Sequence, residues 1–336
     1  MSKLNFESYP PLFRPPKDPI QKSDSIKSKE ACNKLDMLPI IDMQCLDLVN
    51  VDRVCKEWGI FRLVNHGVPI NLFKSLQEHA KKIFDMSYEF KQSFISSCPI
   101  NYFWGTPALT KAGVAVQREP SSRNLDWMEG FHVPFSQLYN YHTLVDDHPL
   151  IHSFRNLLKD YSEHITKIGS TIFEAMIKSL ELEEQTSREY LDQSTGLVRI
   201  YRYPRHNNAD EVIRGLHVHT DSSVLSILSE DQVGGLKFLK DDRWLDVQPI
   251  SGTLIVNLGD MMQVISDDKY KSVKHKVEVN KQRERFSICY FVFPQENTLI
   301  HSSNYKPFTY NDFRAQVQLD LQTVGRKIAL QSFKLN

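Results

Sequence analysis

Two histidines and one aspartate are spaced so that their side chains could bind one metal ion. His219 and Asp221 lie two residues apart in a predicted β-strand, and His275 follows Asp221 by 54 residues in a second one, Ser272–Val279. Side chains at positions i and i+2 of a strand point to the same face, roughly 7 Å apart along it, so the first two can converge on an ion. Two imidazoles and one carboxylate on a barrel wall form a facial triad. That set suits Fe(II) and leaves coordination positions open for substrates.

Arg285 and Ser287 could bind a carboxylate beside this metal. They follow His275 by 10 and 12 residues and share one face of a third predicted strand, Glu284–Pro294. A guanidinium is planar, permanently charged and able to bind a carboxylate through two hydrogen bonds. The pair therefore predicts a carboxylate clamp.

This spacing resembles that of the plant 2-oxoglutarate- and Fe(II)-dependent dioxygenases, in which His-x-Asp, a distant His and then Arg-x-Ser follow one another. In that family the second Tyr of an Asn-Tyr-Tyr-Pro motif also binds 2-oxoglutarate, which implies the same role for Tyr203. Tyr201 and Arg202 stand where the family usually has Asn and Tyr. Residues 38–42 and 58–67 also resemble the N-terminal module of the family. The resemblance implies Fe(II) as metal, 2-oxoglutarate as co-substrate and ascorbate as reductant.

The formal charges of this predicted site balance. Fe(II) contributes two positive charges and Arg285 one, while Asp221 contributes one negative charge and 2-oxoglutarate two. A buried site needs such a balance, because an uncompensated buried charge costs several kcal/mol. The family chemistry is oxidative decarboxylation of 2-oxoglutarate to succinate, coupled to hydroxylation or desaturation of a substrate.

The segment from Asp221 to Pro294 looks most like the gibberellin-oxidase branch of the family. This resemblance implies a small, largely apolar plant metabolite, with a gibberellin-type diterpenoid acid as one candidate and a flavonoid, an alkaloid or another hormone as alternatives. The side chains expected to contact the substrate are aromatic, apart from one histidine that precedes the triad: His217, Phe291, Phe293, Tyr102, Trp127 and Phe131.

Two other classes stay open at this point. One is a catalytically silent protein that binds iron and 2-oxoglutarate without turnover. The other is a metal cupin of another class, such as an isomerase that uses His217, His219 and His275.

The composition favours an intracellular enzyme that acts on small molecules. The 336 residues include 41 Lys and Arg and 41 Asp and Glu, so the net charge is zero, which argues against a nucleic acid or a membrane surface as main partner. We expect no membrane span and no obligate protein partner, only a small-molecule substrate and dioxygen. The five cysteines are odd in number and lack metal-binding spacing. They indicate reduced thiols and a cytoplasmic location, with the nucleus also open.

The predicted fold is α+β. Short strands with turn signals follow one another from Gly196, which favours a closed β architecture, and the resemblance implies a double-stranded β-helix, or jelly roll. The predicted parts are a loose N-terminal arm (1–37), a module of helices and strands packed on the barrel (38–195), the jelly-roll core (196–295) and a C-terminal helix (296–336). Residues 38–336 are expected to form one compact unit.

Overall fold

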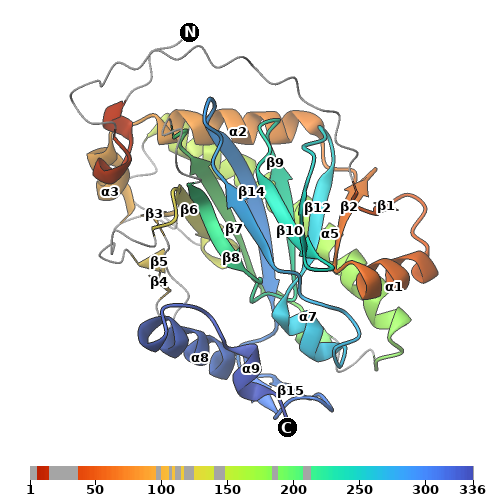
Figure 1. The fold of residues 1–336 in the computed structure, drawn as a ribbon. Coiled ribbons are helices and arrows are strands. Elements are labelled where there is room, and N and C mark those ends of the chain that lie inside the picture. The colour runs from red at the N-terminus through yellow and green to blue at the C-terminus, as the bar shows by residue number, and fades with distance from the viewer. Residues whose placement is uncertain are drawn as a thin grey trace.

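Two β-sheets face each other at the centre of the computed structural model, which describes residues 6–14, 37–95, 100–105, 108–109, 115–116, 125–139, 148–183, 188–206 and 213–335 (Figure 1). Within these residues the larger sheet has the strand order β1-β2-β12-β9-β14-β7-β6-β3, and the smaller one has the order β11-β10-β13-β8. Helices flank the larger sheet. The predicted α+β jelly roll is confirmed.

The elements have the following bounds. The larger sheet consists of β1 (Ile40–Asp42), β2 (Ile60–Val64), β12 (Leu254–Leu258), β9 (Leu225–Glu230), β14 (Arg285–Phe293), β7 (Asp192–Tyr203), β6 (Glu129–Pro134) and β3 (Asn101–Trp104). The smaller sheet consists of β11 (Arg243–Asp246), β10 (Leu236–Lys240), β13 (His275–Glu278) and β8 (Arg214–His219). Two short pairs are β4 (Ala108–Leu109) with β5 (Ala115–Val116), and β15 (Leu299–Ile300) with β16 (Phe308–Thr309). The helices are α1 (Leu48–Glu57), α2 (Ile70–Phe84), α3 (Tyr88–Ile95), α4 (Phe135–Leu138), α5 (Pro149–Ser179), α7 (Asp260–Ile265), α8 (Tyr310–Thr323) and α9 (Leu330–Phe333), with 3-10 turns at Phe6–Ser8 and Pro11–Phe13.

The strand β7 shows how the larger sheet separates two environments. Tyr201 and Tyr203 belong to the apolar cluster between the sheets, together with Phe238 of the smaller sheet. Val198 and Ile200 belong to the other cluster, under the helices. Successive side chains of a strand point to opposite faces. We call the side toward the smaller sheet the inner face and the helix-covered side the outer face.

The long helix α5 covers the outer face. Its buried residues recur at the three- and four-residue spacing of an amphipathic helix, for example Leu158, Ile165 and Ile172. They join the cluster that also contains Ile227 and Tyr290 of the larger sheet. The helix therefore holds the outer face of the strands that carry candidate site residues on their inner face.

Both ends of the chain differ from the sequence prediction. Within the expected loose arm, Tyr9 and Phe13 are buried in the outer cluster, while 15–36 lie outside the described residues. At the other end, the expected single helix stops at Thr323. Gly325 has a φ of 75°, a left-handed conformation that favours glycine and ends a helix.

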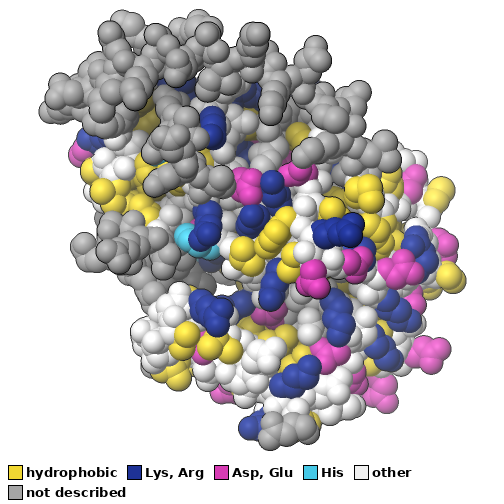
Figure 2. All heavy atoms as spheres, in the orientation of Figure 1, with side chains coloured by type: hydrophobic (Ala, Val, Ile, Leu, Met, Phe, Trp, Pro, Cys, Tyr) yellow, Lys and Arg dark blue, Asp and Glu magenta, His cyan; other side chains and the backbone are white. Residues whose placement is uncertain are grey.

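The surface shown in Figure 2 carries basic and acidic side chains interspersed with one another, in keeping with the zero net charge. In the described part of the chain, no helix combines the length and apolar character needed to cross a bilayer.

Candidate active site

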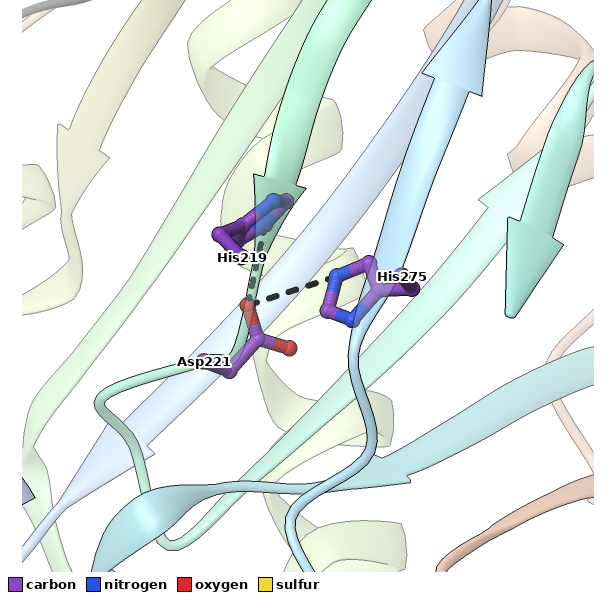
Figure 3. A group of neighbouring side chains, drawn as sticks. All are labelled: His219, Asp221 and His275. Carbon is purple, nitrogen blue, oxygen red and sulfur yellow. Dashed lines mark ion pairs between the residues drawn. The ribbon is translucent and has the colours of Figure 1, made fainter. Parts of the chain in front are cut away.

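His219, Asp221 and His275 lie together at one end of the smaller sheet (Figure 3). His219 ends β8, His275 begins β13, and the two residues pair across these antiparallel strands. Asp221 follows in the loop after β8, so the prediction that it shares a strand with His219 is wrong, but its carboxylate still points between the two imidazoles. Its Oδ1 is 3.7 Å from Nε2 of His219 and 3.7 Å from Nε2 of His275.

The donor set fits a ferrous ion. A distance of 3.7 Å is too long for a hydrogen bond, so the three ligand atoms face one another without satisfying one another. These three ligand atoms lie within 4.8 Å of one another. In the described residues, no other three His, Cys, Asp or Glu side chains bring their ligand atoms this close together. Two imidazoles and one carboxylate on one side of an ion make the facial triad of non-haem Fe(II) oxygenases.

Neighbouring groups orient each ligand atom. Nδ1 of His219 donates a hydrogen bond to the carbonyl of His217 (2.7 Å), and Nδ1 of His275 donates to the carbonyl of Val273 (3.0 Å). A carbonyl only accepts, so Nδ1 of each ring carries a proton, and Nε2 is the nitrogen that a neutral ring offers to a metal. Such outer contacts fix the tautomer and the orientation of metal-binding histidines.

The carboxylate of Asp221 is held in the same way. Its Oδ2 accepts hydrogen bonds from the Ser226 hydroxyl (2.6 Å) and the Asn257 amide (2.7 Å), which leaves Oδ1 for the metal. Burial alone would raise the pKa of Asp221, but His275, His219 and these hydrogen bonds together lower it. Burial and the nearby His275 lower the pKa of His219 to about 4. At neutral pH Asp221 is therefore ionised and His219 neutral, which are the forms that bind a metal.

The loop that carries Asp221 is clamped from two other parts of the chain. The backbone N–H of Asp260, at the start of α7, donates to the carbonyl of Asp221 (2.8 Å). Lys327, in the segment after α8, donates to the carbonyl of Thr220 (2.6 Å) and to the carboxylate of Asp260 (2.7 Å). The C-terminal segment thus contacts the metal-ligand loop directly.

Arg285, Ser287 and Tyr203 lie together on the inner face, as the sequence predicts. Arg285 pairs with Tyr203 between β14 and β7, and its guanidinium lies 5.0 Å from the centre of the Tyr203 ring. Nη1 of Arg285 donates to the Ser287 hydroxyl (3.1 Å). Gly215 of β8 allows this packing, because a Cβ there would lie 2.6 Å from the Tyr203 ring.

A second carboxylate touches this clamp and was missed from the sequence. Nη2 of Arg285 donates to Oε2 of Glu230 (2.8 Å), with both side chains nearly fully buried. Glu230 pairs with Ser287 across β9 and β14. Strand alternation from Ser226 could have placed it on the inner face, since 226 and 230 have the same parity. When the negative charge of Glu230 is included, the formal charge of the site filled with Fe(II) and 2-oxoglutarate is minus one rather than zero.

His217 lies beside the triad without joining it. Its backbone N–H donates to Oδ1 of Asp126 (2.7 Å), and its ring Nδ1 donates to the same oxygen. A register shift between the His275 and Val277 pairs of β13 and β8 interrupts the regular alternation of β8 between Leu216 and His219. The group of His217, His219 and His275 required by the cupin alternative therefore does not form.

Three of the expected substrate contacts do not line the inner face. Tyr102 and Phe131 belong to the outer cluster, and the Phe131 ring stacks on Phe84 of α2. Trp127 packs on Phe13 of the N-terminal segment, with ring centres 4.4 Å apart. The inner position on β3 is held by Phe103, which meets Tyr201 edge-on.

The two phenylalanines at the end of β14 also separate. Phe291 packs against the inner cluster. Phe293 stacks on Tyr310 of α8 and packs against the outer cluster, because a register shift between Phe291 and Phe293 changes its direction. Phe291 stays a candidate substrate contact, whereas Phe293 joins the packing of the C-terminal helix.

Arg199 is a further inner-face residue that the sequence analysis missed. It has the same parity as Tyr201 and Tyr203, and it pairs with Cys289 of β14. Its guanidinium lies 5.6 Å from the centre of the Phe291 ring, and its Nε donates to Nδ1 of His132 (3.3 Å). Burial raises the pKa of the Cys289 thiol, Asp221 raises it further and Arg199 lowers it. Arg199 and Asp221 are thus both near one thiol.

Two family models match the chain. The 2OG-Fe(II) oxygenase superfamily model matches residues 194–294, which include the triad and the clamp. The second model, which describes the N-terminal region of the non-haem dioxygenase in morphine synthesis, matches residues 38–152.

Individual proteins are similar over most of the chain. Gibberellin 2-beta-dioxygenase 6 of Oryza sativa subsp. japonica is 34% identical, over 84% of this chain and 77% of its own length. Gibberellin 2-beta-dioxygenase 8 of Arabidopsis thaliana is 32% identical, over 84% of this chain and 80% of its own. The crystal structure of JOX2 in complex with 2OG, Fe and JA superposes with a TM-score of 0.72 at 26% identity and covers 89% of each chain.

Proposed function

The chain belongs to the 2OG-Fe(II) oxygenase superfamily, and on this premise we propose that it hydroxylates or desaturates a small, largely apolar carboxylic acid. It is a 2-oxoglutarate-dependent dioxygenase that uses Fe(II). When bound, the iron supplies the oxidation of an unactivated C–H bond at the expense of dioxygen and 2-oxoglutarate. The protein's own residues bind, orient and shield the reactants.

Each proposed role follows from the position of the side chain. His219, Asp221 and His275 hold the iron from one side. Arg285 and Ser287 bind the distal carboxylate of 2-oxoglutarate, and Tyr203 supports the guanidinium. The His219 side chain is 29% exposed and that of His275 is 12% exposed, so these two ligands are not sealed off from solvent, and a substrate could approach an ion that they would hold.

Arg199 is the observation that carries the substrate class. Among the described residues no carboxylate forms an ion pair with its guanidinium, although the side chain is only partly exposed and near Phe291. The guanidinium of a partly buried arginine is stabilised most by an anionic partner. An apolar acid would place its carboxylate on Arg199 and its carbon skeleton near Phe291 and the iron. A gibberellin-type diterpenoid acid is the first candidate, since the similar rice and Arabidopsis proteins are named gibberellin 2-beta-dioxygenases.

The test uses acids and their neutral methyl esters as matched substrates. The purified protein is incubated with Fe(II), 2-oxoglutarate, ascorbate and a panel of gibberellin-type acids, flavonoids and alkaloids. We expect succinate formation coupled to a gain of one oxygen, or a loss of two hydrogens, for an acid and not for its ester. Turnover of the ester as efficient as that of the acid contradicts the proposal.

Arg199→Met and Arg199→Lys separate binding from chemistry. We expect the Met variant to raise KM for the acid by about tenfold to a hundredfold, in line with the loss of one charge-assisted contact, while the rate of uncoupled 2-oxoglutarate decay is retained. The Lys variant keeps the charge and should recover part of the loss. Ascorbate as reductant and a cytoplasmic location belong to the same proposal.

A further inference from the structure

Glu230 occupies part of the clamp that is proposed for the co-substrate. The Arg285 guanidinium has five N–H donors. One donates to Ser287 and another to Glu230, whereas Nε has no partner in the described structure. The clamp therefore still has donors for a second carboxylate, but a resident carboxylate is already bound to it.

The environment of Glu230 strengthens the effect of its charge on any other carboxylate bound to Arg285. Its side chain is 5% exposed, and Oε1 has no hydrogen-bond partner among the described residues. Arg285, 1% exposed, is the one cation with which the described structure pairs it. In such a poorly solvated place, two carboxylates on one guanidinium repel each other more strongly than they would in water.

The strand β9 connects the two ends of the co-substrate site. Ser226, Leu228 and Glu230 alternate with residues of the outer cluster such as Ile227. Ser226 supports the metal ligand Asp221, and Glu230 binds the clamp residue Arg285. A 2-oxo acid bound to the metal would extend its distal end toward Glu230 along this strand.

We propose that Glu230 sets the affinity for 2-oxoglutarate, because the distal carboxylate of the co-substrate must share Arg285 with it. The proposal rests on the proposed function of Arg285 as the co-substrate clamp. The consequence is a dioxygenase whose 2-oxoglutarate affinity is weaker than its clamp could provide. Its turnover would then respond to changes in 2-oxoglutarate concentration instead of staying saturated.

The first experiment compares wild type with Glu230→Gln, which keeps the shape and an acceptor oxygen but removes the charge. Both proteins are loaded with Fe(II) without oxygen, and the dissociation constant of 2-oxoglutarate is measured by calorimetry. We expect Glu230→Gln to bind 2-oxoglutarate at least about tenfold more tightly, since one nearby like charge is removed from a poorly solvated site. Unchanged or weaker binding overturns the proposal and makes Glu230 an orienting partner of Arg285.

Two controls isolate the charge effect. The first is 2-oxovalerate, which has the same metal-chelating end but a methyl group in place of the distal carboxylate; its affinity should not change in Glu230→Gln. The second is Glu278→Gln in β13, a carboxylate paired with Lys237 and Lys276, which should leave both affinities unchanged.

A measurement on the wild type keeps the proposal testable if Glu230→Gln does not fold. We expect wild type to prefer 2-oxoglutarate over 2-oxovalerate by less than about tenfold, since the gain from the clamp is offset by repulsion. A preference above about a hundredfold overturns the proposal. If metal-loaded wild type binds neither 2-oxo acid, the function proposed for the clamp fails, which is a different outcome from an insensitive Glu230.

Discussion

The two faces of the larger sheet carry two buried polar clusters that differ in how completely their atoms are paired. The inner polar cluster is the triad with Arg285 and Glu230. The outer polar cluster, under the helices, consists of Lys91, Glu129 and Arg202, whose side chains are all 0% exposed. The strand β7 contributes to both, because Tyr203 points inward and Arg202 outward.

The outer polar cluster satisfies its own hydrogen bonds. The three N–H donors of Lys91 meet the carbonyls of Ser8 and Phe84 and the carboxylate of Glu129, at 2.6 to 3.0 Å. Glu129 also accepts from Nε of Arg202 (2.6 Å) and from the Tyr102 hydroxyl (2.5 Å). The cluster ties the N-terminal segment, α2 and α3 to β6 and β7.

The inner polar cluster leaves its atoms open. Buried atoms without a partner in the described residues include Asn257 Oδ1, Glu230 Oε1 and Arg285 Nε in or beside the inner polar cluster, whereas none belongs to Lys91, Glu129 or Arg202. The three ligand atoms of the triad also face one another beyond hydrogen-bond distance. Unpaired buried polar atoms cost stability, and a ligand bound between the triad and Arg285 would pair those of the inner polar cluster. The comparison thus assigns ligand binding to the inner polar cluster and folding to the outer one.

The largest effect is expected for His275→Ala. Loss of one of three metal ligands should exceed the roughly 10–100-fold cost of losing a supporting residue, so we expect turnover to fall at least about a thousandfold. The melting temperature of the metal-free protein should hardly change. Metal content, succinate formation and calorimetry measure the three quantities. Retained metal binding and turnover would remove the distinction between the clusters.

Glu129→Gln should show the opposite pattern. It leaves Lys91 and Arg202 buried without their shared carboxylate, which should cost about 3–5 kcal/mol in the free energy of unfolding. Metal affinity of the folded protein should be unchanged. Urea unfolding measures the loss, and Glu57→Gln in an exposed pair with Arg53 is the control, expected within about 0.5 kcal/mol. A loss of metal binding with unchanged stability would contradict the assignment.

Lys327→Met should give the smallest effect. It removes the contact between the C-terminal segment and the loop that carries Asp221, so we expect metal affinity to fall about tenfold, as for other outer-contact losses. A chelator competition measures it. Lys334→Met, in a half-exposed pair with Asp268, is the matched control and should have no effect. If the two variants have equal metal affinities, the contacts of Lys327 do not position the metal ligand Asp221.

The sequence was sufficient for the parts whose chemistry depends on spacing alone. The triad and the pair of Arg285 and Ser287 were found because residue types that are rare in strands recur at fixed separations. The jelly roll followed from short strands and from the family resemblance. For Arg285 and Ser287 it was enough to know which residues share a face of a strand, whereas Asp221 reaches the other ligands from a loop and not from the strand predicted for it.

Prediction of the remaining site residues requires the phase and the register of each strand. Tyr102, Phe103 and Trp104 are consecutive aromatics, so their sequence does not reveal which one points inward. A register shift turns Phe293 away from Phe291, and another displaces His217 from the regular alternation. Glu230 and Arg199 were overlooked although parity with Ser226 and Tyr203 places them inward. Tyr9 and Phe13 lie in a segment too polar to suggest burial.

Anomalous X-ray diffraction from crystals grown with Fe(II) and 2-oxoglutarate without oxygen tests the central claim most directly. The account predicts one iron peak at roughly 2.0–2.2 Å from Nε2 of His219, Nε2 of His275 and an oxygen of Asp221. It also predicts a carboxylate of 2-oxoglutarate on the Arg285 guanidinium. An iron peak away from these three side chains, or 2-oxoglutarate bound without contact to Arg285, would contradict it.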